Sequence, residues 1–579
     1  MSGHQMKSGA SDAEPSFAAE VMLRFLKSSG VDMFFCNPGT DFPSIVETYS
    51  RAKKEGTIGR TVPKPVVVPH ENAAVAMAHG YYMVSGKPQA VMVHVSVGTG
   101  NTLNGITNAS RDQTPILLMA GRSPITEQGA HGSRNRPIHW AQEMFDQAGM
   151  LRELVKWDYE LKRPDLIEAV IARAQEIMMA GPRGPVYVTL PREVLSAPVA
   201  ASNSAAVAKA APSVAAPDPG AIEILAKWIA EAKRPLIISG STGRTKEGFV
   251  ALSEFAERFA IPVIVGRRYV CLPASHSMHM GFEPKSELQD ADLVIVLESD
   301  VPWLPSLEAP PENCRVVHLG EDPAFARYPF RNFRSDLAIV AGAAGALKTL
   351  SEALTKYLPP SSKQVSLRRD AVARARAALH ADWKAKDEAA AGHADIKPEW
   401  ISRCISDAVG EDAIIVNEYP LRLEHCPRTK YGTMFGLSPA GGLGWGLGAA
   451  IGAKLASPDK LVIATLGDGT YMFCNPTPCH WVSQVQKAPI LTVIYNNQRY
   501  GAVRSATLSM YDDARSGEDA GNFLADLSPS PAFEKLVEAS GGYGERVERP
   551  ADLPQALARA IRVVRDEGRQ ALLNVICRY

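Results

Sequence analysis

The sequence lacks an excess of charge of either sign, since 62 Lys and Arg residues balance 62 Asp and Glu residues in a chain of 579. Binding along nucleic acid needs a basic surplus, so this balance argues against nucleic acid as a partner. Cysteine is scarce, with 8 residues, and no two of them form a Cys-x-x-Cys pair or complete a zinc spacing with histidines. Scattered cysteines in so long a chain are typical of free thiols in a reducing compartment.

Other familiar segments are missing as well. The first residues contain no apolar run of the kind found in a secretory signal. The two common nucleotide loops, Gly-x-Gly-x-x-Gly and Walker A, do not occur. One uncharged stretch, residues 431–453, is long enough to cross a bilayer, but its many glycines and Pro439 predict a loop that leads into a buried helix. We therefore expect a cytoplasmic protein without a membrane partner.

The apolar residues, 46% of the chain against 21% charged, occur in short runs that alternate with helix-like segments. This order is typical of parallel sheets covered by helices on both faces, and the length requires several domains. The sequence therefore predicts an α/β fold of three doubly wound parallel-sheet domains. The expected strands are residues 31–36, 66–69, 90–94, 116–120 and 186–190, then 236–239, 263–265, 293–297 and 316–319, and finally 413–416, 461–466, 490–495 and 571–577.

Two unusual segments predict the domain boundaries. Residues 197–219 are rich in Ala, Ser and Pro with almost no charge, which is typical of a linker. Residues 361–395 include an Ala-rich run of charges of alternating sign, which is typical of a solvated connecting helix. These segments divide the chain into an N-terminal domain of residues 1–196, a central domain of residues 220–360 and a C-terminal domain of residues 396–579.

The strongest motif lies in the C-terminal domain, where two buried strands end in polar residues. The run KLVIATL ends in GDGT at residues 467–470, and the run ILTVIY ends in NNQRYG at residues 496–501. The carboxyl ends of parallel strands are where open α/β sheets bind ligands. A carboxylate from Asp468, an amide oxygen from Asn497 and a main-chain carbonyl two residues on suit Mg²⁺, while the glycines let a diphosphate approach and Thr470 offers a donor to it.

This pair of motifs resembles the cofactor signature of thiamine diphosphate enzymes, and the resemblance extends over essentially the whole chain. Members of that family have a pyrimidine-binding, a central and a diphosphate-binding domain, which matches the three domains expected here. The resemblance implies that Asp468, Asn497 and the carbonyl of Arg499 hold Mg²⁺ on the diphosphate. It also implies cofactor-binding roles for Gly467, Gly469, Thr470 and Tyr500. Whether the central domain holds FAD stays open, because no motif requires it.

A glutamate in the N-terminal domain adds to the resemblance. Glu71 follows the second expected strand, in the run VVVPHENAAVAMA. The family carries a glutamate there that bonds the pyrimidine ring of the cofactor and promotes formation of the reactive ylid. Proton transfer by a positioned carboxyl group is general acid–base catalysis. Taken alone, Glu71 suits equally well the positive end of a helix.

A glycine-rich segment, PAGGLGW at residues 439–445, resembles the family's support for the V-shaped cofactor. The resemblance implies that Leu443 is an apolar wedge beneath the thiazolium and that the Gly441 carbonyl accepts a hydrogen bond from the cofactor's amino group. The same stretch has glycines at a spacing of four, Gly444, Gly448 and Gly452, which predicts a close helix contact.

Two runs in the N-terminal domain narrow the resemblance to benzoylformate decarboxylase and its relatives. The run CNPGTD at residues 36–41 matches their loop after the first strand, with Thr40 in place of a serine, and a hydroxyl there can bond a substrate carboxylate or carbonyl. The run VHVSVGTGN resembles their segment with an active-site histidine, here His94, and His276 falls where they have a second one. Histidine is apt for proton transfer near pH 7, and a satisfied core histidine is the alternative for each.

Three features depart from that pattern. After GDGT the chain has YMFCNPTPCHW, whose prolines re-aim the next helix, so we expect a different substrate pocket and regard His480 as a further acid–base candidate. The loop at residues 131–137 and the pair Arg267 and Arg268 are basic, and they suit either an anionic part of a substrate, such as a CoA phosphate, or a solvated surface. Residues 502–530 are rich in Asp, Ser and Gly, which predicts a mobile lid.

The resemblance as a whole implies a thiamine diphosphate- and Mg²⁺-dependent lyase that cleaves or forms a C–C bond next to a carbonyl group, most closely a 2-oxo acid decarboxylase or carboligase. A 2-hydroxyacyl-CoA lyase and an acetolactate synthase-like enzyme are alternatives within the family, and a non-catalytic cofactor-binding relative is the alternative outside enzymes. Because the family builds each site from two chains, we expect a homodimer or homotetramer that acts on a small 2-oxo acid or a 2-hydroxyacyl-CoA.

Overall fold

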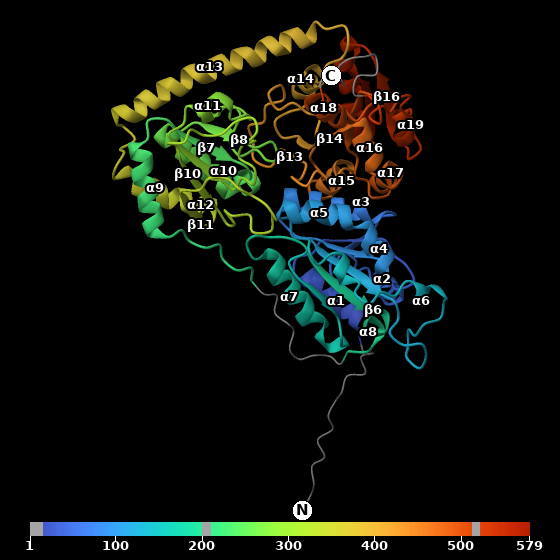
Figure 1. Cartoon of the computed structure of the whole chain (residues 1–579). Coiled ribbons are helices and arrows are strands. Elements are labelled where there is room, and N and C mark those ends of the chain that lie inside the picture. Colours follow the sequence, from blue (N-terminus) through green and yellow to red (C-terminus); the bar gives the residue numbers. More distant parts are fainter. Residues whose placement is uncertain (1–15, 200–209, 512–521, 579) are drawn as a thin grey trace, which may run out of the picture.

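The computed structural model describes residues 16–199, 210–511 and 522–578. These residues form three parallel sheets with helices packed around each, which confirms the predicted α/β fold class (Figure 1). The extreme N-terminus, residues 200–209 of the expected linker and residues 512–521 of the expected lid lie outside the described residues.

The N-terminal sheet has the strand order β2-β1-β3-β4-β6-β5. Its strands are β1 (Met33–Cys36), β2 (Lys64–Val67), β3 (Ala90–Val93), β4 (Leu117–Arg122), β5 (Asp158–Glu160) and β6 (Val186–Pro191). The helices are α1 (Ala18–Ser28), α2 (Pro43–Lys54), α3 (Glu71–Ser85), α4 (Val95–Asn101), α5 (Leu103–Arg111), α6 (Ile138–Ala141), α7 (Ile167–Met179) and α8 (Arg192–Ser196). Apolar residues cover both faces of the inner strands, as expected of a parallel sheet.

The central sheet has the order β11-β10-β9-β7-β8. Its strands are β7 (Pro235–Ser239), β8 (Val263–Val265), β9 (Leu293–Leu297), β10 (Arg315–Gly320) and β11 (Leu337–Val340), with helices α9 (Pro219–Glu231), α10 (Lys246–Phe259), α11 (Lys285–Gln289) and α12 (Ala343–Thr355). The long helix α13 (Lys363–Ala391) then runs from the central domain across to the C-terminal domain (Figure 1).

The C-terminal sheet repeats the topology of the first, with the order β13-β12-β14-β15-β17-β16. Its strands are β12 (Ile414–Glu418), β13 (Met434–Gly436), β14 (Val462–Gly467), β15 (Leu491–Asn496), β16 (Tyr543–Val547) and β17 (Ala571–Ile576). Its helices are α14 (Pro398–Ala408), α15 (Gly446–Ala456), α16 (Asp468–Phe473), α17 (Pro476–Val485), α18 (Gly501–Met510), α19 (Phe533–Glu538) and α20 (Leu553–Asp566).

Four short strands were not expected from the sequence: β5, β11, β13 and β16. All four lie at a sheet edge. An edge strand has one neighbour, so it does not need the continuous apolar run that identifies a strand buried on both faces. The sequence DYE of β5 has no such run, and β13 is only three residues long.

The domains are joined by a tight contact between α3 and α15, which lie against each other (Figure 1). A Cβ added at Gly80 would lie 1.9 Å from the Ala449 carbonyl oxygen, and one at Gly452 would lie 1.9 Å from the Met77 carbonyl oxygen. Only glycine fits at these two positions, and the predicted glycine contact is thus present on α15.

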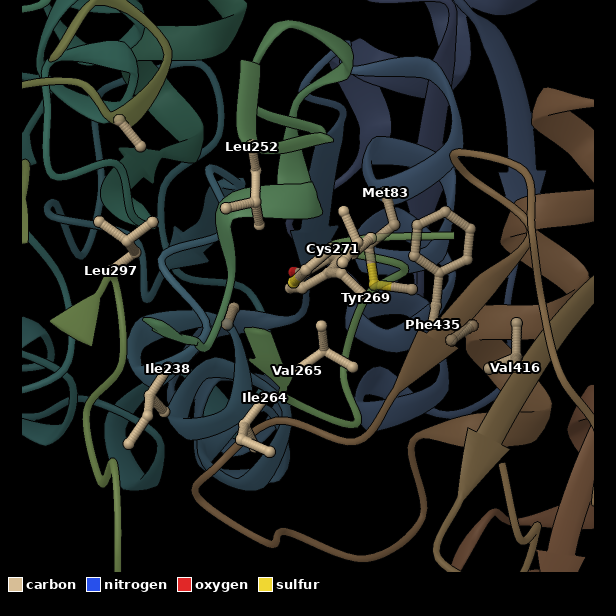
Figure 2. Close-up of a cluster of buried hydrophobic side chains, with 14 of the residues drawn as sticks. Met83, Ile238, Leu252, Ile264, Val265, Tyr269, Cys271, Leu297, Val416 and Phe435 are labelled. Atoms are coloured by element: carbon tan, nitrogen blue, oxygen red, sulfur yellow. The ribbon is translucent and has the colours of Figure 1, made fainter. Parts of the chain in front are cut away.

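A buried apolar cluster continues across all three domains. Figure 2 shows Tyr269 of the central domain beside Phe435 of the C-terminal domain, with Met83 of α3 close by. The rings of Tyr269 and Phe435 meet edge to face, with centroids 6.2 Å apart. All eight cysteines are free and buried. None of the helices in the described ranges combines the length and apolar character required to span a membrane.

Candidate active site

The carboxyl ends of β14 and β15 lie side by side because the strands pair in parallel, with Gly467 opposite Tyr495. An open cavity of about 1070 Å³ lies at this edge of the C-terminal sheet. Its lining includes nine of the residues proposed from the sequence to bind cofactor or metal: Gly441, Leu443, Gly467, Asp468, Gly469, Thr470, Asn497, Arg499 and Tyr500. The structure therefore brings together residues that are widely separated in the chain.

Asp468 is the first residue of α16, and only 3% of it is exposed. Its Oδ1 accepts a hydrogen bond of 2.9 Å from the amide of Gly469. Its Oδ2 is buried and has no hydrogen-bond partner within the described residues. Burial raises the pKa of this carboxyl group, against the smaller opposing effects of nearby amides, among them those of Gly469, Gln498 and Arg499. A buried carboxylate oxygen without a partner is costly, so a cation fits this position.

The loop after β15 places Asn497 in the lining of the same cavity as Asp468. Oδ1 of Asn497 accepts a hydrogen bond from the amide of Arg499 at 3.2 Å, and Gln498 adopts a left-handed backbone with a φ of 58°. This turn holds the Asn497 amide and the Arg499 backbone at the cavity wall. No cluster of three or more His, Cys, Asp and Glu side chains suited to a metal occurs among the residues described. A metal here would thus rely on Asp468, an amide oxygen and a carbonyl.

Tyr419 is a cavity residue that the sequence does not predict. It follows β12 directly, lines the cavity and is 59% exposed. Its φ of 86° is unfavourable for a residue with a side chain, and such strain is concentrated at functional sites. Its hydroxyl lies 3.3 Å from the position of a Cβ added at Gly441. No local sequence pattern marks a residue of this kind.

Glu71 begins α3, where the preceding His70 caps the helix by accepting a hydrogen bond from the amide of Asn72. Only 7% of Glu71 is exposed, and its Oε2 accepts a hydrogen bond of 3.0 Å from Nδ2 of Asn101. A Cβ added at Gly98 would lie 3.3 Å from Oε1, so α4 passes close to this carboxylate. Glu71 is therefore held in one orientation at the edge of the N-terminal sheet.

His94 lies nearby, between β3 and α4. Its Nδ1 is 2.6 Å from Oδ1 of Asp41, and its Nε2 is 3.3 Å from Nε2 of Gln142. The hydrogen bond that His94 donates to the Asp41 carboxylate raises the pKa of His94, and the charge of Glu71 acts in the same direction. Asp41 was not singled out from the sequence, although it belongs to the same CNPGTD run. The Asp41 carboxylate fixes the ring and favours its protonated form.

Thr40 faces a histidine that the sequence does not predict as a site residue. Its Oγ1 is 3.4 Å from Nε2 of His139, which is buried on α6. The amide of Asn135 donates to Nδ1 of His139, so Nε2 of the neutral ring carries the hydrogen and donates to Thr40. Burial lowers the pKa of His139, and nearby arginines including Arg192 add to the effect. The Thr40 hydroxyl hydrogen is therefore left to point at another acceptor.

His276 and His480 have different surroundings from those expected of acid–base groups. In His276, Nδ1 accepts from the amide of Met278 and Nε2 lies 3.2 Å from the carbonyl of Ser253, so both nitrogens bond main chain of the central domain. His480 is 1% exposed and lies between the Tyr471 hydroxyl and the Gln570 side chain. Burial lowers the pKa of His480 to about 4. His480 is thus a satisfied core histidine, the alternative to its candidate role.

Three arginines of the basic segments form ion pairs within the chain. Arg267 bonds Glu424 at 2.6 Å, and Arg268 bonds Asp300 at 3.1 Å. In the loop at residues 131–137, Arg134 pairs with Glu143. These ion pairs leave no free arginine at Arg267, Arg268 or Arg134 for an anionic substrate. Part of the segment expected to form a lid is the helix α18, which lines the cavity.

The cavity is lined from one domain alone. Within the described residues, its whole lining lies between Tyr419 and Arg578. Glu71, His94 and Thr40, all in the N-terminal domain, do not line it. One copy of the chain thus presents two separate groups of candidate residues.

Comparison with known families agrees with this division. Residues 17–150 match the model described as "Thiamine pyrophosphate enzyme, N-terminal TPP binding domain", residues 222–350 match its central domain, and residues 419–575 match its C-terminal TPP binding domain. The chain belongs to the thiamine pyrophosphate enzyme family. The two matched TPP-binding domains contain the two groups of residues described above and indicate thiamine diphosphate as the cofactor of this enzyme.

Individual relatives of this thiamine pyrophosphate enzyme are distant and match three quarters or more of its length. It is 25% identical over 569 residues to acetolactate synthase isozyme 3 large subunit of Escherichia coli, covering 95% of this chain and 92% of that protein. It is 27% identical over 454 residues to benzoylformate decarboxylase of Pseudomonas aeruginosa, covering 75% and 79%. The crystal structure of benzoylformate decarboxylase from Polynucleobacter necessarius superposes with a TM-score of 0.77 at 20% identity, covering 97% of this chain and 98% of that one. At this identity the superposition establishes the shared fold.

Proposed function

We propose that this thiamine pyrophosphate enzyme uses thiamine diphosphate and Mg²⁺ to break or form a C–C bond next to a carbonyl group, as a 2-oxo acid decarboxylase and carboligase of the benzoylformate decarboxylase type. The observation that carries the proposal is the buried, unpartnered Oδ2 of Asp468 in a cavity lined by all the other predicted diphosphate and metal ligands. A diphosphate with its metal fits a cavity that has a carboxylate, an amide oxygen and close glycine backbone at one edge.

Each residue has a defined task in this proposal. Asp468, Asn497 and the carbonyl of Arg499 would hold Mg²⁺, with Thr470 and Tyr500 beside the diphosphate. When bound, thiamine diphosphate supplies the carbon nucleophile and accepts the electron pair that bond cleavage releases. The protein contributes binding, orientation and proton transfer around it.

The N-terminal domain would supply the groups that handle protons and substrate. Glu71 is the acid–base group that bonds the pyrimidine ring, and Asn101 keeps its carboxylate in place. His94, whose protonated form Asp41 favours, is suited to deliver a proton to the product. Thr40, whose oxygen accepts from His139, has its hydroxyl hydrogen free to bond the carboxylate of a 2-oxo acid.

The separation of these groups supports assembly from two copies, as a homodimer or homotetramer. Exposed apolar residues flank both of them: Val97 and Leu103 near Glu71, and Met472 and Phe473 after Thr470. Apolar side chains next to an unfinished site favour association, because a partner would cover them. The eight free, buried thiols support a reducing compartment such as the cytoplasm.

A substrate screen tests the proposal directly. Purified protein with thiamine diphosphate and Mg²⁺ is assayed for CO₂ release from benzoylformate and pyruvate and for cleavage of a 2-hydroxyacyl-CoA, with a chelated sample as the control. We expect metal-dependent CO₂ release, faster from benzoylformate than from pyruvate. Turnover of the CoA ester alone would assign a 2-hydroxyacyl-CoA lyase and overturn the decarboxylase proposal. Formation of acetolactate from pyruvate as the main reaction would overturn it in favour of a synthase.

A further inference from the structure

Residues 441–446 link β13 to α15 and include Leu443, which lines the cavity. We call these residues the wedge segment. Residues 441–445 of this segment lie in a loop without regular structure, and Gly446 begins α15. No hydrogen bond of a helix or sheet therefore fixes the position of Leu443 in the cavity. Hydrogen bonds from two other parts of the chain do so instead.

The first set comes from the N-terminal domain. Nδ2 of Asn104, on α5, donates to the carbonyl of Leu443 at 2.8 Å. Nδ2 of Asn108 donates to the carbonyl of Gly442 at 2.7 Å, and its Oδ1 accepts from the amide of Gly442 at 3.1 Å. Two asparagines one helical turn apart thus bind the main chain of two consecutive residues, Gly442 and Leu443, because residues four apart share one face of a helix.

The second set comes from Glu418, the last residue of β12, which is fully buried. Its Oε1 accepts from the amide of Gly444 at 2.8 Å and from that of Trp445 at 3.3 Å, and its Oε2 accepts from the amide of Gly446 at 2.6 Å. These amides stand at the start of α15, where a negative charge is favoured. Burial raises the pKa of the Glu418 carboxyl group to about 7, and the three hydrogen bonds from amides oppose this effect by stabilising the carboxylate.

The glycines of the wedge segment let the side chains of Asn104 and Glu418 lie close to its backbone. A Cβ added at Gly442 would lie 2.4 Å from Oδ1 of Asn104, and one at Gly446 would lie 2.9 Å from Oε2 of Glu418. Between them, Gly444 has a φ of 95°, which favours glycine. The amino-acid pattern of the segment therefore matches its two sets of hydrogen-bond partners.

From this geometry we infer that Asn104, Asn108 and Glu418 are positioning residues for Leu443, so that the N-terminal domain sets the shape of the cofactor support in the same chain. The inference rests on the proposed function, in which Leu443 lies beneath the cofactor. Asparagines on one side hold carbonyls and Glu418 on the other side holds amides. Loss of either set would let Leu443 shift while the diphosphate and metal ligands stay in place.

Hydrogen exchange in the cofactor-free protein is the first test. Amide exchange of peptides covering the wedge segment is compared among wild type, Asn104→Ala and Glu418→Gln, with Thr107→Ala and Glu411→Gln as controls. The Thr107 hydroxyl bonds only the carbonyl of Leu103 in its own helix, and Glu411 is an exposed turn residue. From ordinary hydrogen-bond strengths we expect exchange about fivefold faster in Asn104→Ala and about fiftyfold faster in Glu418→Gln, with no change in the controls.

Cofactor binding and turnover give the second test. Because both variants keep the diphosphate and metal ligands, the Kd for thiamine diphosphate with Mg²⁺ should change by less than about threefold in each. In contrast, kcat should fall about tenfold in Asn104→Ala and about a hundredfold in Glu418→Gln, since small misplacements are costly at the reacting centre. Wild-type exchange and wild-type kcat in both variants would overturn the inference. If Glu418→Gln does not fold, Asn104→Ala decides, because this side chain is exposed. Failure of the wild type to bind the cofactor would instead overturn the proposed function, and calorimetry distinguishes the two results.

Discussion

Replacing Asp468 by Asn should reverse the order of stability between variant and wild type when ligand is added. In the cofactor-free protein, Oδ2 of Asp468 is buried without a partner, and burial raises the pKa of the carboxyl group above its ordinary value of 3.8. A group with a raised folded-state pKa lowers stability as pH rises above the unfolded value, and the cost is complete above the folded pKa. Ionised Asp468 therefore destabilises the cofactor-free protein at pH 7.

The size of the reversal follows from two terms. An unsatisfied buried polar group costs about 1–3 kcal/mol, so a neutral Asn should stabilise the cofactor-free protein by about 1 kcal/mol. Ligand at a hundred times its Kd adds about 2.7 kcal/mol to a protein that binds it. Wild type gains this term with Mg²⁺ and thiamine diphosphate, whereas Asp468→Asn loses the metal ligand and gains almost none. With ligand, wild type should thus be the more stable by about 2 kcal/mol.

Thermal unfolding of both proteins at pH 7, each with and without Mg²⁺ and thiamine diphosphate, measures the reversal. A chelated sample with thiamine diphosphate alone separates the contribution of the metal. The reasoning is refuted if Asp468→Asn gains as much stability from the ligands as wild type does. It is also refuted if the variant is the less stable protein in the absence of ligand, because Asp468 would then have a stabilising partner.

Three further predictions concern histidines. Asp41→Asn removes the hydrogen-bonded charge that raises the pKa of His94. In a profile of kcat/KM against pH, the limb that reports His94 should therefore move to lower pH. An unmoved limb would show that the pair does not act in turnover. Gly39→Ala would place a Cβ 2.2 Å from Nδ1 of His94. The kcat of a folded variant should therefore fall about 10²–10⁴-fold, as expected for a displaced acid–base group, and a wild-type kcat would contradict this role. His480→Gln should lower stability by about 1–3 kcal/mol, seen in urea unfolding, with kcat within about twofold, and a large loss of kcat would restore its acid–base role.

Much of the site could be predicted because its residues follow buried strands directly. Asp468 and Asn497 come at the ends of β14 and β15, whose apolar runs are evident in the sequence. Parallel pairing then forces the two strand ends together, whatever the rest of the chain does. The sequence predicts the inner strands of all three sheets for the same reason, together with the edge strands β2 and β8, whereas it does not predict the other four edge strands.

The rest of the site depends on contacts between distant segments. Nothing near Asn104, Asn108 or Glu418 in the sequence shows that they meet residues 441–446. Docking of the N-terminal domain on the C-terminal domain creates the contacts of the two asparagines, and packing within the C-terminal domain creates that of Glu418. His139 likewise reaches Thr40 across 99 positions of the chain. His480 was proposed as an acid–base group from its place after GDGT, and only the structure shows that its ring turns into the core.

Glu71→Gln tests the central claim most directly. Gln keeps the shape of the side chain and its hydrogen bond to Asn101 but has no carboxyl proton to transfer, and Asp468, Asn497 and Arg499 remain to hold Mg²⁺ and the diphosphate. The account predicts that calorimetry finds binding of thiamine diphosphate with Mg²⁺ within about threefold of wild type, while turnover of the best substrate falls by about 10² or more. Turnover at the wild-type rate by a folded Glu71→Gln protein with bound cofactor would contradict the account.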